Sequence, residues 1–329
     1  MTSEQLDWHG GSAVQHALGG MLAGLRLTLP DGRVVEPLHA APWLDEPALP
    51  GLPGIMRGLQ GDFVCVPFGT GDPSPLPPRW QAMGVAAPQI DPPHGFGANG
   101  MWQVTRDGAA LCATIDYPDA DPIARLSRRM TPLAGGRVNM AVTITPRRDC
   151  SLPIALHPIF RLGADTRLRP GAHGPVWTHP CGSGVDPCPL LPDAVAEGLH
   201  DLPGRDGTTL DFTRLPRTEP CESRLLITQT DGRFTLDHHA EGWSVTLEWD
   251  ATLLPSLMLW VSNRGRSHAP WNGRHLALGV EPCIAAFDLG AVASAAPSPL
   301  TDAGVRTVMN LAADTPVVIR YALSVAPLG

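Results

Sequence analysis

The stretch LLITQTDGRFTLD, residues 225–237, has the pattern of two short strands joined by a turn. Its apolar runs, 225–230 and 234–237, have the length of strands, and an Asp-Gly pair typical of β-turns separates them. Similar segments recur at 22–29, 34–38, 111–117, 138–145, 243–249, 256–262 and 317–325, with further Asp-Gly turns at 31–32 and 107–108. The pattern predicts an antiparallel, all-β protein.

Glycine and proline are abundant and scattered, as in a chain of many strands and turns. The 329 residues include 35 Gly and 36 Pro, and few windows longer than ten residues carry an uninterrupted helical stripe. We therefore expect few short helices. Two broad sheets packed face to face would bury the apolar faces, which predicts one large β-sandwich domain over residues 1–329.

Charge excludes several classes of function. The net charge of −8 argues against nucleic acid as a partner, because phosphate backbones are held by clustered basic residues. All 24 basic residues are arginine, so a lysine Schiff base and a P-loop are both excluded. Histidine, carboxylate, cysteine or serine chemistry remains.

The seven cysteines form an odd set without any C-x-x-C pair, which fits neither a disulfide framework nor a common zinc motif. His179, Cys181 and Cys188 lack a fourth ligand at the usual spacing, so we expect no zinc site there. The first 20 residues have no basic segment followed by an apolar one, and no run of 18 apolar residues occurs. We expect a cytoplasmic protein that does not bind membranes.

Three polar residues stand out against their apolar surroundings. Glu281 ends an apolar run in GVEPC (279–283), His157 lies in LHPIF (156–160), and His94 opens the glycine-rich segment HGFGANGMW (94–102). A carboxylate in such a setting is rarely left unpaired, so Glu281 is either half of an acid/base pair with His157 or the partner of a buried arginine. The two histidines could equally be a satisfied core residue and a turn cap.

The tryptophans divide into two groups by setting. Trp243, Trp249 and Trp260 lie in strand-like segments and are expected in the core. Trp102 and Trp271 lie in glycine-bounded loops, where either a core position or a sugar-stacking surface fits.

Five segments, in order, resemble the aldose 1-epimerase (galactose mutarotase-like) family, and more nearly its hexose-6-phosphate 1-epimerase-like branch. The likeness covers about 20–325, which we expect to be the core of the domain. Its segments are MRG through CVPFG (56–69), HGF through Trp102, LHPIF (156–160), TDGRF (230–234) and GVEP (279–282). Each motif alone is weak, but their shared order is specific.

The resemblance implies a sugar cleft across one sheet of a galactose mutarotase-like supersandwich, without cofactor or metal. It implies His157 as the general acid for the ring oxygen and Glu281 as the general base for the anomeric hydroxyl. It also implies substrate contacts from His94, Arg57 and Asp231. We expect the two catalytic groups on opposite sides of the sugar, as a protonated imidazole and an ionised carboxylate.

The sequence departs from the phosphate-epimerase pattern His-Gly-Phe-Ala-Arg, because Gly97, Ala98 and Asn99 follow Phe96. The missing guanidinium removes a bidentate phosphate clamp and favours a neutral monosaccharide substrate. The alternatives are a hexose-phosphate epimerase and a carbohydrate-binding or sensing protein without turnover. A glycosidase would need a second marked carboxylate, for which only Asp211 and Asp231 are candidates. If the protein is an aldose 1-epimerase, we expect a role in carbohydrate metabolism, as a monomer or homodimer.

Overall fold

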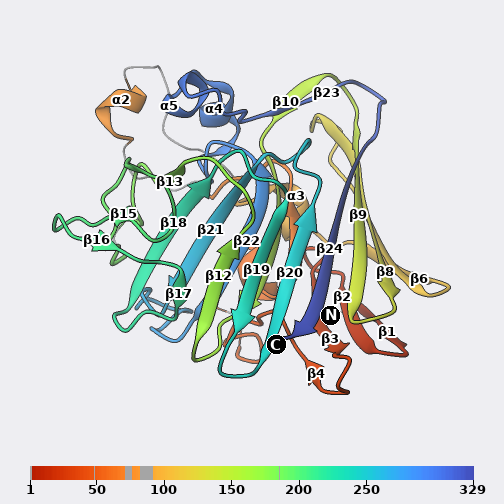
Figure 1. The fold of residues 1–329 in the computed structure, drawn as a ribbon. Helices are drawn as coiled ribbons and strands as arrows, with labels where there is room; N and C mark the ends of the chain where they lie inside the picture. Colours follow the sequence, from red (N-terminus) through yellow and green to blue (C-terminus); the bar gives the residue numbers. More distant parts are fainter. Residues whose placement is uncertain (1, 48, 71–75, 82–91, 185) are drawn as a thin grey trace.

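The computed structural model describes residues 2–47, 49–70, 76–81, 92–184 and 186–329. Within these residues, two large antiparallel sheets form a β-sandwich (Figure 1). The 11-stranded sheet has the order β1 (Ser3–Trp8), β2 (Gly11–His16), β3 (Leu22–Thr28), β5 (Asp62–Cys65), β11 (Ile154–Arg161), β22 (Leu276–Ile284), β21 (Ser256–Asn263), β18 (Cys221–Ile227), β13 (Val176–Thr178) and β14 (Val195–Ala196), with β4 (Val34–Val35) paired to β3.

The second sheet has nine strands, in the order β17 (Arg214–Leu215), β12 (Thr166–Pro170), β19 (Arg233–His238), β20 (Trp243–Trp249), β24 (Val317–Pro327), β9 (Arg137–Pro146), β8 (Ile123–Leu133), β7 (Ala110–Asp116) and β6 (Gln103–Asp107). Two small ladders pair β10 (Cys150–Leu152) with β23 (Met309–Leu311) and β15 (Leu202–Pro203) with β16 (Thr209–Leu210). The expected all-β sandwich is confirmed.

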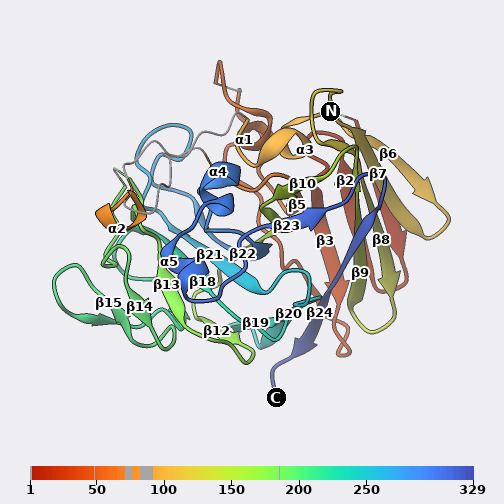
Figure 2. The ribbon, with the colours of Figure 1, turned by 90° about the horizontal axis from the view of Figure 1, so that it is seen from above.

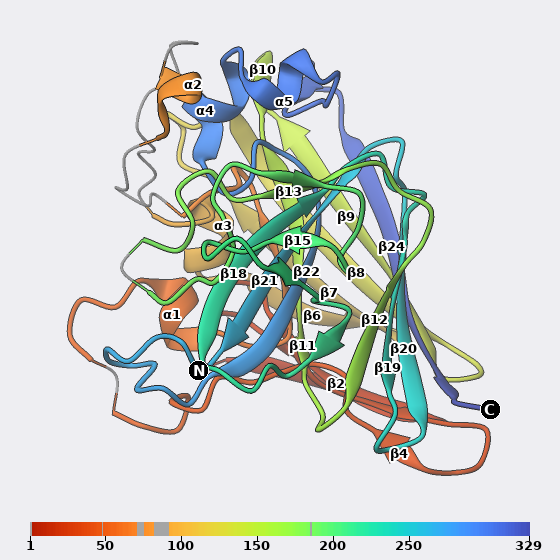
Figure 3. The ribbon, with the colours of Figure 1, turned by 60° about the vertical axis from the view of Figure 1, so that its left-hand side comes forward.

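The helices in the described residues are short and lie mainly outside the sandwich. They are α1 (Gly54–Gly58), α2 (Pro78–Gln81), α3 (Gly95–Asn99), α4 (Gly290–Ala295) and α5 (Pro299–Asp302). Figures 2 and 3 show α1, α3 and α4 on the side of the 11-stranded sheet that faces away from β12, β19 and β20. The 11-stranded sheet is therefore covered on both faces.

The Asp-Gly turns at 31–32, 107–108 and 231–232 have different roles. Those at 31–32 and 107–108 join paired strands, β3 to β4 and β6 to β7. The turn at 231–232 instead carries the chain from β18 in one sheet to β19 in the other. Its Gly232 has φ +84°, a conformation that glycine adopts without strain.

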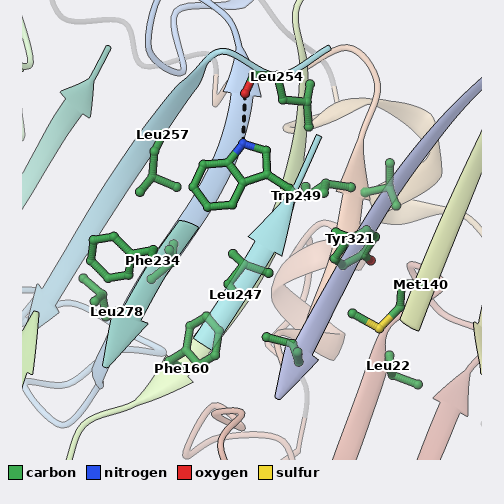
Figure 4. Packing of buried hydrophobic residues seen from close by; sticks show 14 of the residues in the cluster. Leu22, Met140, Phe160, Phe234, Leu247, Trp249, Leu254, Leu257, Leu278 and Tyr321 are labelled. Carbon is green, nitrogen blue, oxygen red and sulfur yellow. Dashed lines mark hydrogen bonds between the residues drawn. The ribbon is translucent and has the colours of Figure 1, made fainter. Parts of the chain in front are cut away.

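Side-chain alternation gives the 11-stranded sheet two apolar faces. In β11, Leu156 and Phe160 point into the core between the sheets, whereas Ala155 and Ile159 pack on the outer face. Figure 4 shows the inner core, where Phe160 and Leu278 of this sheet meet Phe234 and Leu247 of the other, and Trp249 donates a hydrogen bond to a backbone carbonyl. Strands buried on both faces explain why β11, β21 and β22 appear as nearly continuous apolar runs.

One ionic cluster ties the two sheets together inside the core. Arg128 of β8 forms an ion pair with Asp62 of β5, and both side chains are fully buried. The Tyr321 hydroxyl of β24 donates to Asp62 Oδ2 at 2.7 Å and accepts from Arg128 Nη2 at 2.9 Å. Breaking such a pair by removing one partner is costly, because it leaves an uncompensated buried charge. The cluster also fixes β5, which pairs directly with β11.

Candidate active site

Strand register places His157 and Glu281 side by side on the outer face of the 11-stranded sheet. Ala155 pairs with Cys283 and Ile159 with Gly279, so His157 of β11 lies opposite Glu281 of β22. Their side chains meet, with His157 Nε2 3.3 Å from Glu281 Oε1. Both residues are buried, at 3% and 0% exposure. The two groups that the sequence singled out are therefore in direct contact.

The contact is not a hydrogen bond, and the polar atoms of the pair are not satisfied by the other residues that the structure describes. Both Glu281 oxygens and His157 Nδ1 are buried without a hydrogen-bond partner among them. Unsatisfied buried polar atoms are rare in folded proteins and call for a specific explanation. Here they open into a cavity, where a hydroxyl-bearing ligand could supply donors and acceptors.

The cavity has a volume of about 370 Å³, within the size range of small-molecule sites. Its floor continues across the sheet from Glu281 to Met258 and Trp260 of β21 and Arg224 of β18. The loop between β21 and β22 adds Trp271 to the wall. Trp260 is buried, as expected, in the apolar cluster on the outer face of the sheet, to which its alternation with Leu259 and Val261 turns it. From there it also lines the cavity.

His94 enters the same cavity from the start of α3. It has φ 59°, and the following Gly95 has φ +80°, where a Cβ atom would lie 2.2 Å from the Val66 carbonyl oxygen. The glycine therefore lets the turn approach the sheet closely enough to bring the His94 ring within 5.2 Å of the His157 ring, centroid to centroid. Burial lowers the pKa of His94 to about 4, so this imidazole is neutral at physiological pH.

Burial also sets the protonation of the central pair. Desolvation, aided by His94, lowers the pKa of His157 well below its usual range. Desolvation, aided by Asp288 and opposed by Arg224, raises the pKa of Glu281 well above its usual range. These directions favour a neutral imidazole beside a protonated carboxyl group over the expected imidazolium and carboxylate. The two states have the same total number of protons. They differ only in whether the transferable proton is on Glu281 or on His157.

Asp288 is a second buried carboxylate in the lining, and it is ionised. Burial alone would raise its pKa, but Arg224 and His179 outweigh burial and hold it well below its usual range. Arg224 Nη1 donates to Oδ2 at 2.7 Å, His179 Nε2 lies 2.9 Å from Oδ1, and Thr70 Oγ1 donates to Oδ2 at 3.1 Å. Arg224 is thus an ion-pair partner of Asp288 rather than of Glu281.

A second arginine, Arg266, completes the wall above Trp260. Its guanidinium carbon lies 4.4 Å from the ring centroid of Trp271 and 5.4 Å from that of Trp260. Its Nε is 3.2 Å from Asp186 Oδ2 and 3.6 Å from Glu222 Oε2. Glu222 also accepts a hydrogen bond from the Trp260 indole. Each lining arginine is therefore paired with carboxylates.

Three residues that the sequence analysis considered for sugar binding lie outside this cavity. Arg57 is exposed and lines a separate hollow beside Trp43 and Glu46. Asp231 is exposed in its turn, where it accepts a hydrogen bond from the Ala172 backbone. Trp102 is buried in the inner core and donates to the Gly97 carbonyl. The structure brings together His94, His157 and Glu281 only.

The sequence did contain a signal for the residues that were missed. Glu222 and Arg224 stand two apart in the strand CESRLLI, so they share one face, and that face is the one that carries Trp260 across the register. Asp288 and Arg266 lie in connections, where no periodic pattern marks them. Their partners are distant in sequence, and only the fold brings them together.

Among the residues described, no group of histidine, cysteine and acidic side chains could hold a metal ion. His179, considered as a ligand with Cys181 and Cys188, instead binds Asp288. No helix in the described part of the chain is long and apolar enough to cross a membrane.

Comparison with solved structures identifies the fold. A candidate aldose 1-epimerase from Escherichia coli K12 superposes with a TM-score of 0.66 at 16% identity, covering 99% of both chains. A galactose mutarotase-like protein from Lactobacillus casei gives 0.59 at 16% identity, over 98% of this chain and all of that one. An aldose epimerase homologue from C. elegans gives 0.60 at 13% identity, over 100% and 99%. No family model and no curated protein matches the sequence.

The chain therefore has the fold of the aldose 1-epimerase and galactose mutarotase-like proteins, a large antiparallel β-sandwich. At these identities the likeness establishes the architecture, and the chemistry must be argued from the cavity itself.

The raised pKa of Glu281 predicts how stability depends on pH. Between the unfolded carboxyl pKa of about 4.3 and the raised folded value, the native state holds a proton that the unfolded state has lost, so stability falls as pH rises. Glu281→Gln removes this cost. The variant should gain stability over wild type by up to about 1.4 kcal/mol per pH unit above pH 4.3, measured by urea unfolding at several pH values.

Glu197→Gln, at an exposed carboxylate, is the matched control and should leave the stability difference from wild type flat across the same range. If the stability of Glu281→Gln also runs parallel to wild type at all pH values, the raised pKa is contradicted.

Proposed function

We propose that the protein is an aldose 1-epimerase, which interconverts the α and β anomers of a monosaccharide by opening and reclosing its ring. The observation that carries the proposal is the buried contact of 3.3 Å between His157 Nε2 and Glu281 Oε1, at the floor of a cavity of sugar size. Ring opening removes a proton from O1 and delivers one to O5. An adjacent base and acid supply both.

The side-by-side arrangement suits this reaction, because O1 and O5 are both bonded to the anomeric carbon. Glu281 takes the O1 proton while His157 gives its proton to O5, and the C1–O5 bond breaks. The ring-opened sugar is then an aldehyde beside a neutral His157 and a protonated Glu281. Rotation about C1–C2 presents the other face of the carbonyl, and the reverse transfers close the ring as the second anomer.

The electrostatics of the pair favour ring opening once the proton resides on His157. Burial makes an imidazolium here a stronger acid and a carboxylate a stronger base than in water. Proton transfer across the contact charges the resting pair, and the hydroxyl groups of the bound sugar can stabilise the two charges. The ring-opened state restores the uncharged pair that the site prefers.

The lining supports a neutral sugar. Arg224 is paired with Asp288, and Arg266 with Asp186 and Glu222, so neither guanidinium offers an uncompensated charge to a phosphate. Trp260 and Trp271 provide the aromatic faces on which sugar rings stack. We propose a single domain that acts on monosaccharides in carbohydrate metabolism in the cytoplasm, without a cofactor.

His157→Ala and Glu281→Gln should each lower the rate of anomer exchange by about 10²- to 10⁴-fold, because each removes one of the two proton transfers. The measurement is polarimetry of freshly dissolved aldoses, or NMR exchange between their anomeric protons. His200→Ala, at an exposed residue, is the control and should retain the wild-type rate.

Sugar binding by wild type without any acceleration would contradict the epimerase and favour a binding protein. Full activity of either cavity variant would contradict the assigned acid and base.

Gly279 should be essential for a steric reason. A Cβ atom at this position would lie 2.4 Å from Glu281 Oε1 and 3.2 Å from the Trp260 Cβ atom, although the extended backbone itself admits alanine. Gly279→Ala should therefore displace the carboxylate and lower kcat by at least about 10²-fold. The shorter side chain of Glu281→Asp withdraws the carboxylate from the added Cβ atom. This substitution should therefore lower kcat less in the Gly279→Ala background than in wild type.

If the two substitutions lower log kcat additively in this double-mutant cycle, Gly279 does not act through the position of the Glu281 carboxylate. The urea midpoints of all three variants verify that each is folded.

A further inference from the structure

The cavity has an apolar side and a polar side. Over β5 and β11, the helix α1 contributes Ile55, Met56 and, just after its end, Leu59. Over β18 and the loops beyond it lie Arg224, Ser183 and Asp186. His157 and Glu281 stand between the two sides, with His157 on the strand nearer α1 and Glu281 on the strand nearer β18.

This order gives the bound sugar a direction. If His157 protonates O5 and Glu281 takes the O1 proton, O5 lies toward β11 and O1 toward β22. The ring carbon attached to O5 is C5, so the substituent on C5 extends toward α1. The C2 hydroxyl lies on the O1 side of the ring, toward the charged and hydroxyl side chains, whereas the C4 hydroxyl lies on the same side of the ring as the C5 substituent.

The described residues on the α1 side offer little to a polar C5 substituent. Helical geometry, at about 100° per residue, turns Arg57 away from the face that carries Ile55 and Met56, and it lines the separate hollow instead. The Asn99 side chain is occupied by the Ile55 amide and by the carbonyls of Pro93 and Gly95. Ala98, where the phosphate-epimerase pattern has arginine, is a buried methyl group.

The other polar groups nearby lie at the reacting end of the sugar. The Thr70 hydroxyl donates to Asp288, and the His94 ring, whose Nδ1 has no described hydrogen-bond partner, stands 5.2 Å from the His157 ring. A hydroxymethyl or phosphorylated C5 substituent would therefore lose its water without gaining partners from the described lining.

From this division we infer that the preferred substrates are 6-deoxyaldohexoses, whose C5 substituent is a methyl group that packs against Met56 and its neighbours. The inference rests on the proposed function, because the assigned acid and base set the direction of the ring. It extends that function by naming the substrate class, which neither the family resemblance nor the fold specifies.

The test compares sugars that differ only at C5. For the galacto configuration these are 6-deoxygalactose, arabinose without C6, galactose and galactose 6-phosphate, and for the gluco configuration 6-deoxyglucose, xylose, glucose and glucose 6-phosphate. The kcat/KM for anomer exchange should be greatest for the 6-deoxy sugar in at least one series, exceeding the parent hexose by about 10- to 100-fold. The pentose should fall between them, and the 6-phosphate should be slowest.

Two variants at the half-buried Met56 tie the preference to the α1 side. Met56→Gln keeps the volume and adds an amide that can bind a 6-hydroxyl group, so it should reduce the preference for the 6-deoxy sugar by about 10-fold. Met56→Leu is the matched control and should keep the preference. Circular dichroism and thermal unfolding verify that both variants are folded.

A parent hexose or 6-phosphate turned over as well as the 6-deoxy sugar in both series would overturn the inference while leaving the epimerase intact. A Met56→Gln variant with an unchanged preference would likewise overturn it. No acceleration of any sugar would instead contradict the proposed function, and the inference with it.

Discussion

The buried contact between an imidazole and a carboxyl group is the feature on which the site depends. Both Glu281 oxygens and His157 Nδ1 have no described hydrogen-bond partner, and both residues lie in a low-dielectric setting that disfavours charge. A polar pair of this kind is a poor stabiliser, because desolvation costs more than the contact returns. Its position beside a cavity with aromatic and charged walls makes chemistry the better explanation.

The sheet makes this arrangement possible because its residues alternate between two faces. Leu156 and Phe160 seal the sandwich, while His157 between them faces outward, and the same division holds for Val280 and Glu281 in the next strand. A slip of one residue in either strand would turn the acid or the base into the inner core. The Asp62–Arg128–Tyr321 cluster, which fixes β5 to the opposite sheet, adds to the rigidity of this register. The site is thus built on two central strands of the 11-stranded sheet.

The sequence predicted the fold class well and the site in part, for reasons that individual residues make clear. Strand length and Asp-Gly turns are local signals, so the sandwich could be foreseen, although the turn at 231–232 proved to cross between sheets. Glu281 and His157 were marked by polarity within apolar runs. Their protonation was not foreseeable, because it depends on burial and on Asp288 and Arg224, which reach the cavity from other segments. Arg57 shows the converse: one position along a short helix separates the cavity-facing Met56 from a side chain that faces another hollow.

The pH dependence of anomer exchange by the wild-type protein tests the protonation of this pair most directly. The pKa of His157 is lowered and that of Glu281 is raised, so the account predicts that kcat does not change as the pH crosses about 6.5, the ordinary pKa of histidine. A rate limb near pH 6.5, the ordinary pKa of histidine, or an absence of any exchange above the buffer rate would contradict it.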